Sequence, residues 1–76
     1  MNKDWHIHSS YSDSSRSVAE IINQCKSIGL KSISITDHDT VLGTYEALEY
    51  NDEFFDVVVG IEISDGMIIY KEKFIS

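Results

Sequence analysis

Three short runs of strand-forming residues, separated by two segments with helical spacing, constrain this chain more than any other feature. The strand-forming runs are residues 5–8, 32–36 and 56–64. The second run alternates polar and apolar side chains, whereas the third is almost continuously apolar, as in a strand buried on both faces. Helices between successive strands imply parallel pairing through right-handed crossovers. We therefore predict an α/β fold with helices between its strands.

The first helix is marked by both of its ends. Ser17 and Glu20 form a capping-box pattern, and apolar residues then recur every three or four positions as far as Ile28. Gly29 follows, where a left-handed residue commonly ends a helix.

A second helix is predicted over residues 41–50, with Thr40 as its cap. The residues expected on its apolar face are Leu42, Tyr45 and Leu48. After the third strand, Asp65 and Gly66 are a strong signal for a two-residue hairpin, so residues 67–75 are predicted to return as a further strand. The complete predicted order is β-α-β-α-β-β.

Length and charge limit the class of protein. A chain of 76 residues forms one domain or less, and it buries only about 60% of the surface that its unfolded form exposes. Cys25 is the only cysteine, so a metal or self-association must supply the extra stability that a disulfide cannot.

The net charge of −7 argues against a nucleic-acid duplex or an anionic membrane as partner. With no long apolar run and no targeting segment, we expect a cytoplasmic protein.

Side chains of metal-ligand type gather near the carboxyl ends of the predicted strands. His6 and His8 lie two residues apart on one strand and therefore face the same side. Asp13 is in the loop that leaves this strand, His38 follows the second strand, and Glu62 lies late in the third. Imidazole and carboxylate groups together suit zinc, manganese or iron.

Each of these residues also has an ordinary structural interpretation. A His-x-His pair alone is more often a surface pair, Asp13 alone is a turn residue, and Glu62 alone suits the solvent face of an edge strand. Their convergence at one end of one sheet favours a metal site. The candidates for orienting the ring nitrogens are Asp4, Asp37 and Asp39. Tyr11 and Arg16 stay open between a substrate contact and a purely structural role.

Four segments together resemble the PHP family, named after polymerase and histidinol phosphatase. They read DWHIHSSYSD from residue 4, IGLK from residue 28, ITDHDT from residue 35 and GIEIS from residue 60. The resemblance looks nearest to the small stand-alone phosphoesterases of the family. It implies that residues 1–76 are a single partial domain, the front part of a seven-stranded β/α barrel. It also implies divalent metal ions (zinc, manganese or iron) and hydrolysis of a phosphate ester by metal-activated water.

The resemblance further implies a role for each matching residue. The implied metal ligands are His6, His8, Asp13, His38 and Glu62, with Glu62 bridging ions. Asp37 would orient a ligand, so Asp37 and His38 are the implied catalytic residues. The implied substrate is a phosphorylated small molecule or a nucleotide.

This chain departs from the family pattern in ways that affect the site. Ser14 stands where the family usually has a glycine, and a left-handed backbone at this position would be strained. No histidine follows His38, so the later ligands of the family would have to come from Asp65, from Glu72 or from a second chain. An uncovered sheet edge leads us to expect a homo-oligomer. The alternatives are a non-catalytic metal-binding or self-associating module, and a fragment without independent function.

Overall fold

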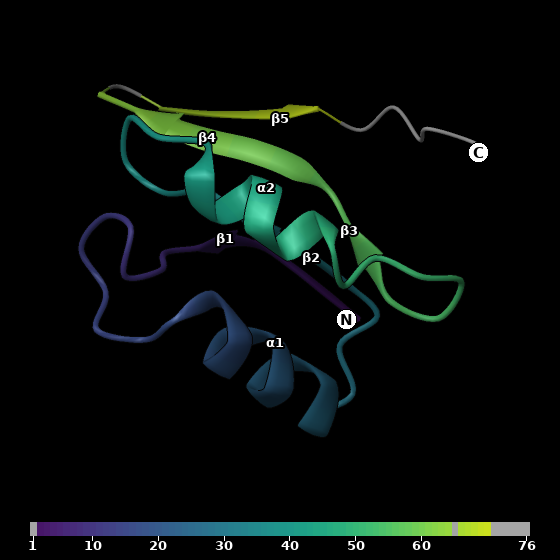
Figure 1. Cartoon of the computed structure of the whole chain (residues 1–76). Coiled ribbons are helices and arrows are strands. Elements are labelled where there is room, and N and C mark those ends of the chain that lie inside the picture. Colours follow the sequence, from purple (N-terminus) through teal and green to yellow (C-terminus); the bar gives the residue numbers. More distant parts are fainter. Residues whose placement is uncertain (1, 65, 71–76) are drawn as a thin grey trace.

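The computed structural model describes residues 2–64 and 66–70, which form five strands and two helices (Figure 1). The elements are β1 (Lys3–Ile7), α1 (Val18–Ser27), β2 (Ser32–Ile35), α2 (Leu42–Leu48), β3 (Asp56–Val57), β4 (Val59–Ile63) and β5 (Gly66–Tyr70). The predicted mixed α/β architecture is confirmed. The seven-stranded barrel is larger than the structure that these residues form, and it stays a prediction.

Strand β2 lies at the centre of a parallel sheet with the order β1-β2-β3. Ile33 of β2 pairs with Asp4 on one side and with Val57 on the other. Parallel neighbours place their carboxyl ends at the same edge of the sheet, so the residues that follow β1 and β2 lie close together. The predicted parallel pairing is confirmed.

The core lies between this sheet and the two helices. Its buried members are Ile7, Val18, Ile21, Ile22, Cys25, Ile33, Ile35, Ala47, Phe55 and Val57. Helix α1 has the predicted capping box at Ser17, and Gly29 follows it with a φ of 86°. The Cys25 thiol faces this core, and burial raises its pKa, which agrees with a packing role.

Helix α2 is shorter than predicted and buries a different face. Leu42 and Tyr45, expected to face the core, are 59% and 57% exposed, whereas Gly43, Thr44 and Ala47 are buried. Small residues are needed here because the helix lies close against buried polar groups. The Thr40 hydroxyl accepts a hydrogen bond from the Leu42 N–H, one residue before the observed cap position. The predicted apolar face is therefore correct at Leu48, which packs against the core, and wrong at Leu42 and Tyr45.

The single strand predicted over residues 56–64 is in fact two strands. The chain leaves the parallel sheet after β3, and β4 pairs with β5 in an antiparallel hairpin along the top of the view in Figure 1. Ile63 pairs with Gly66, so Gly66 belongs to the strand rather than to the turn. Asp65 and residues 71–75 of the predicted return strand lie outside the described residues. Ile63 of β4 is 42% exposed, so the run is not buried on both faces as predicted.

Backbone hydrogen bonds keep the hairpin beside the segment that follows β2. The Glu62 N–H donates to the Asp37 carbonyl at 3.0 Å, and the Asp39 N–H donates to the Glu62 carbonyl at 2.9 Å. These bonds form a parallel bridge between His38 and Glu62, which places both side chains at the same edge. In the part of the chain that the structure describes, no helix is long and apolar enough to cross a membrane.

Candidate metal centre

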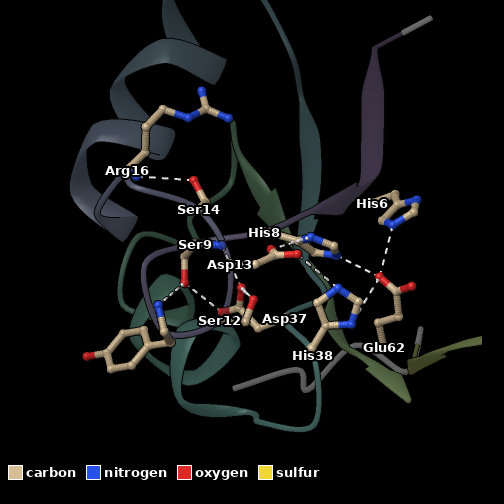
Figure 2. A network of polar contacts seen from close by, with 11 residues as sticks. His6, His8, Ser9, Ser12, Asp13, Ser14, Arg16, Asp37, His38 and Glu62 are labelled. Carbon is tan, nitrogen blue, oxygen red and sulfur yellow. Dashed lines mark hydrogen bonds and ion pairs between the residues drawn. The ribbon is translucent and has the colours of Figure 1, made fainter. Parts of the chain in front are cut away.

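His8 is the hub of a polar cluster at the carboxyl ends of β1 and β2 (Figure 2). Its Nε2 lies 2.6 Å from Oε1 of Glu62, and its Nδ1 lies 2.9 Å from Oδ1 of Asp13. The imidazole ring is thus held between two carboxylates, one from the loop between β1 and α1 and one from β4. The structure brings the predicted ligands together, while their binding of metal stays a prediction.

The remaining two histidines complete two overlapping groups around His8. His6 Nε2 lies 3.1 Å from the same Oε1 of Glu62, and His38 Nε2 lies 3.1 Å from Oδ2 of Asp13. Within each group, one ligand atom per residue lies within 4.8 Å of the others. The two groups are His6, His8 and Glu62, and His8, Asp13 and His38. Nitrogen and carboxylate oxygen donors at this spacing fit zinc, manganese or iron.

The two groups compete for the lone pair of His8. A neutral imidazole has one acceptor nitrogen and one N–H, so it offers a single nitrogen to a metal ion. If His8 Nε2 binds an ion with His6 and Glu62, its Nδ1–H donates to Asp13 and Asp13 orients the ring. If Nδ1 binds an ion with Asp13 and His38, Nε2–H donates to Glu62 instead. With neutral His8, only one three-residue group is complete at a time.

His8 and Glu62 shift each other's pKa in the metal-free chain. Burial lowers the pKa of His8, but the hydrogen bond with Glu62 and the charge of Asp13 outweigh it, so the pKa is raised above 6.5. The hydrogen bond from His8 lowers the pKa of Glu62 below 4.5, aided by His6 and opposed by partial burial. The Glu62 side chain is 23% exposed rather than fully buried, and imidazole rings are its partners. Glu62 therefore carries a negative charge towards the histidines.

Asp37 does not contact a histidine ring, contrary to the role predicted for it. Its carboxylate is fully buried and accepts from the Ser9 N–H at 2.5 Å, from the Ser9 hydroxyl at 2.6 Å and from the Ser12 hydroxyl at 2.9 Å. These bonds are drawn in Figure 2. Asp37 therefore holds the loop that leads to Asp13. The predicted catalytic role of Asp37 and His38 stays untested; the His38 side chain is 42% exposed, so a substrate could reach it.

Among the described residues, neither Asp4 nor Asp39, the other acidic residues expected to orient the histidines, bonds to a histidine ring. Asp4 accepts a hydrogen bond from the His6 N–H at 3.1 Å. Asp39 has a φ of 55° and is the one non-glycine residue with positive φ among residues 2–64 and 66–70. Aspartate tolerates this conformation better than most residues. Ser14 has no positive φ, so the strain predicted at the position of the family's glycine is absent.

Tyr11 and Arg16, left open between a substrate contact and a structural role, both bond to helices. The Tyr11 hydroxyl donates to Glu46 of α2 at 2.6 Å, and Arg16 donates to Gln24 of α1. Both contacts favour the structural interpretation in this conformation.

The sequence analysis did not single out three residues around Asp37. They are Ser9, Ser12 and Gly43. A weak signal was present, because a serine-rich loop beside an aspartate that follows a buried strand offers hydroxyl donors to a buried carboxylate. Gly43 gave no such signal, since its role depends on where α2 lies against the loop.

Comparison with known proteins shows the family to which the chain belongs. The PHP domain family matches residues 4–74, so the chain belongs to the PHP domain family. A phosphoribosyl 1,2-cyclic phosphate 1,2-diphosphodiesterase of Eggerthella lenta is 35% identical over 65 residues, covering 84% of this chain and 25% of that protein. A 5'-3' exoribonuclease of Haemophilus influenzae is 32% identical over 62 residues, covering 80% of this chain and 23% of that protein.

An uncharacterised protein of Methanocaldococcus jannaschii is 35% identical over 83 residues, covering 91% of this chain and 48% of that protein. The chain thus spans from about a quarter to about half of the length of these relatives. The predicted resemblance to the PHP family is confirmed.

Proposed function

We propose that this chain provides part of the active site of a metal-dependent phosphoesterase of PHP type. The observation that carries the proposal is the convergence of three imidazoles and two carboxylates around His8. Each of the five side chains lies within 3.1 Å of another member of the group. A divalent ion bound there lowers the pKa of a bound water and neutralises the oxygens of a phosphoryl group.

The chain's own residues would hold the metal ion, orient the ligands and neutralise the charge of the ion. Glu62 and Asp13 lie at the two ring nitrogens of His8, so each of the two ligand groups includes one carboxylate that favours a cation. His6 and His38 are 55% and 42% exposed, so they border the side from which a substrate can approach. A substrate with negative charge would complement a site that holds a cation.

The proposed substrate is a phosphorylated small molecule or a nucleotide. Two of the relatives are named as a phosphodiesterase and an exoribonuclease, and both names describe enzymes that break phosphate esters. The net charge of −7 opposes binding of a long duplex, which supports a small substrate.

The proposal is tested by hydrolysis of bis(p-nitrophenyl) phosphate with zinc, manganese or iron added to the purified chain. We expect metal-dependent turnover that His8→Ala abolishes, because His8 belongs to both groups of ligands. Glu62→Gln is compared with Glu53→Gln, which changes an exposed glutamate that has no polar contact with the described residues. Loss of activity in the first variant and its retention in the second support the proposal. No turnover with any metal contradicts it for this chain alone.

A second candidate function is a self-associating module, and the surface of the β4–β5 hairpin favours it. One face of the hairpin carries the exposed apolar side chains of Ile63, Ile68 and Tyr70, each between 42% and 55% exposed, whereas Met67 lies on the other face, opposite Glu62. Apolar side chains gathered on one hairpin usually mark a contact surface. A second copy of this chain would cover the exposed apolar face of the hairpin. Sedimentation of the purified chain distinguishes an oligomer from a monomer, and activity then separates an enzyme from a non-catalytic module.

A further inference from the structure

Asp37 is the fully buried carboxylate near the metal centre, and its side chain touches none of the histidines. Its carboxylate accepts three hydrogen bonds from Ser9 and Ser12, at 2.5, 2.6 and 2.9 Å. Both Asp37 and Ser9 are fully buried. A buried carboxylate is costly unless several donors compensate for the water that it loses, so these donors keep the side chain in one place.

The loop from Ser9 to Ser14 is folded around this carboxylate. The Ser9 hydroxyl, which donates to Asp37, also accepts from the Tyr11 N–H at 3.2 Å. The Ser9 carbonyl accepts from the backbone N–H groups of Ser12 and Ser14 at 3.1 and 3.2 Å. Residue 13, whose carboxylate contacts His8 and His38, is therefore enclosed between two positions that are fixed through Ser9.

The backbone of Asp37 also connects this carboxylate to the segments that carry Glu62 and His38. Its carbonyl accepts from the Glu62 N–H at 3.0 Å, and His38 is the next residue along the chain. Helix α2 closes the arrangement, since a Cβ at Gly43 would overlap Oδ2 of Asp37 and come within 2.8 Å of the Ser9 hydroxyl. One buried residue thus links the loop of Asp13, the strand of Glu62 and the position of His38.

We infer that Asp37, with Ser9, Ser12 and Gly43, is a positioning clamp that holds the metal ligands in place before any ion binds. The clamp acts through the backbone of the loop, and it requires a small residue at position 43. This inference deepens the proposed function, because the ligands that it positions are those of the proposed metal centre. Removal of such supporting hydrogen bonds typically weakens metal binding by about tenfold to a hundredfold.

Hydrogen exchange in the metal-free chain tests the clamp without any appeal to activity. The Ser9 amide donates to a buried carboxylate, so we expect strong protection of this amide in the presence of a chelator. Ser12→Ala should speed its exchange by about tenfold or more, while Ser15→Ala should leave it unchanged. The Ser15 side chain lies in the same loop, is exposed, and has no polar contact with the described residues. Rapid exchange of the Ser9 amide in the unaltered chain overturns the inference.

Zinc affinity, measured by calorimetry, provides the second readout. We expect Ser12→Ala and Asp37→Asn to weaken zinc binding by about tenfold or more relative to Ser15→Ala. If Asp37→Asn fails to fold, Ser12→Ala still decides the result. Equal affinity in Ser12→Ala and Ser15→Ala overturns the inference. If the unaltered chain binds no zinc, the proposed function fails for this chain, and the exchange of the Ser9 amide alone decides whether the clamp exists.

Gly43→Ala tests the space behind the clamp, with Gly66→Ala as its control. Alanine usually favours a helix over glycine, so a free site at position 43 would gain stability. The clamp predicts a loss of stability instead, because the added methyl group would displace Asp37 or Ser9. A Cβ at Gly66 meets nothing within 4 Å. We expect a lower melting temperature and faster Ser9 exchange in Gly43→Ala only, and a rise in melting temperature there overturns this arrangement.

Discussion

The β1–α1–β2 unit and the β4–β5 hairpin supply ligands to one metal centre from very different surroundings. Ile21 and Ile33 in the first unit are fully buried, whereas Ile63 and Ile68 in the hairpin are 42% and 55% exposed. The first unit holds its ligands on a packed core. The hairpin carries Glu62 on β4, where Ile63 is exposed while Val59 and Ile61 are half-buried. Backbone hydrogen bonds with Asp37 and Asp39 hold Glu62 beside the histidines.

A matched pair of isoleucines gives the largest expected difference between the two regions. Ile21→Ala should cost about 2–5 kcal/mol of the free energy of unfolding, because it leaves a cavity in the core. Ile68→Ala, at an exposed position, should stay within about 0.5 kcal/mol. Urea unfolding followed by circular dichroism measures both values. Equal losses would contradict the contrast between a packed unit and an uncovered hairpin.

A charge on the hairpin surface should weaken self-association without unfolding the chain. In Ile68→Lys the ammonium group would be buried at any interface that uses the hairpin, so the dissociation constant should rise by about tenfold or more. Sedimentation equilibrium measures this constant, and the unfolding midpoint should hardly change. An unchanged association constant would show that the hairpin is not the contact surface. The control is Ile28→Lys, since Ile28 is 74% exposed and follows α1, outside the hairpin.

The N-terminal cap of α1 should contribute a smaller amount to the free energy of unfolding, through contacts within the first turn of the helix. Ser17→Ala removes the hydroxyl that accepts from the Glu20 N–H, and it should cost about 1 kcal/mol. Ser15→Ala removes a hydroxyl two residues earlier and should have little effect. Thermal unfolding compares the two variants. A loss in Ser15→Ala as large as that in Ser17→Ala would place the stabilising contact elsewhere in the loop.

The smallest expected effect on the fold is the pH dependence of the His8–Glu62 pair in the metal-free chain. The lowered pKa of Glu62 gives a contribution that is present above about pH 4.5 and lost as the pH falls through the folded value. The raised pKa of His8 gives a contribution that is complete below about pH 6.5 and lost as the pH rises through the folded value. The pair should therefore stabilise the chain most between these limits.

Proton NMR of the His8 ring with a chelator present checks this behaviour. Glu62→Gln should lower the pKa of His8, because it removes the negative charge and replaces a charged hydrogen-bond acceptor with a neutral amide oxygen. The same change at the exposed Glu53 should leave it unaltered. A His8 pKa that does not respond to Glu62→Gln would contradict the contact between His8, which follows β1, and Glu62 of the hairpin.

Local features of the sequence predicted the packed unit well. The capping box at Ser17 and the left-handed Gly29 depend on residues close together in the chain, so they were readable directly. The gathering of the histidines also followed from local information, because parallel strands place their carboxyl ends at one edge. The ion pairs of His8 and His38 with Asp13, and of His6 and His8 with Glu62, show this gathering in the structure.

Features that depend on how closely two elements pack could not be predicted from the sequence. The buried face of α2 follows from the space that Asp37 and Ser9 leave at Gly43, which no periodicity encodes. The continuous run from Val57 to Ile63 concealed the break at Val58, where the chain changes from a parallel partner to an antiparallel one. The partners of Asp37 were missed because they lie 25 and 28 residues away in the chain.

Metal binding by a small set of variants tests the central claim most directly. His8 belongs to both groups of ligands, so His8→Ala should abolish binding of zinc or manganese in calorimetry and in elemental analysis. His6→Ala and Asp13→Asn each leave one group intact and should weaken binding without abolishing it. The unaltered chain should hold about one ion tightly, because neutral His8 offers one nitrogen at a time. Binding in His8→Ala as tight as in the unaltered chain, or no binding by the unaltered chain, would contradict the account.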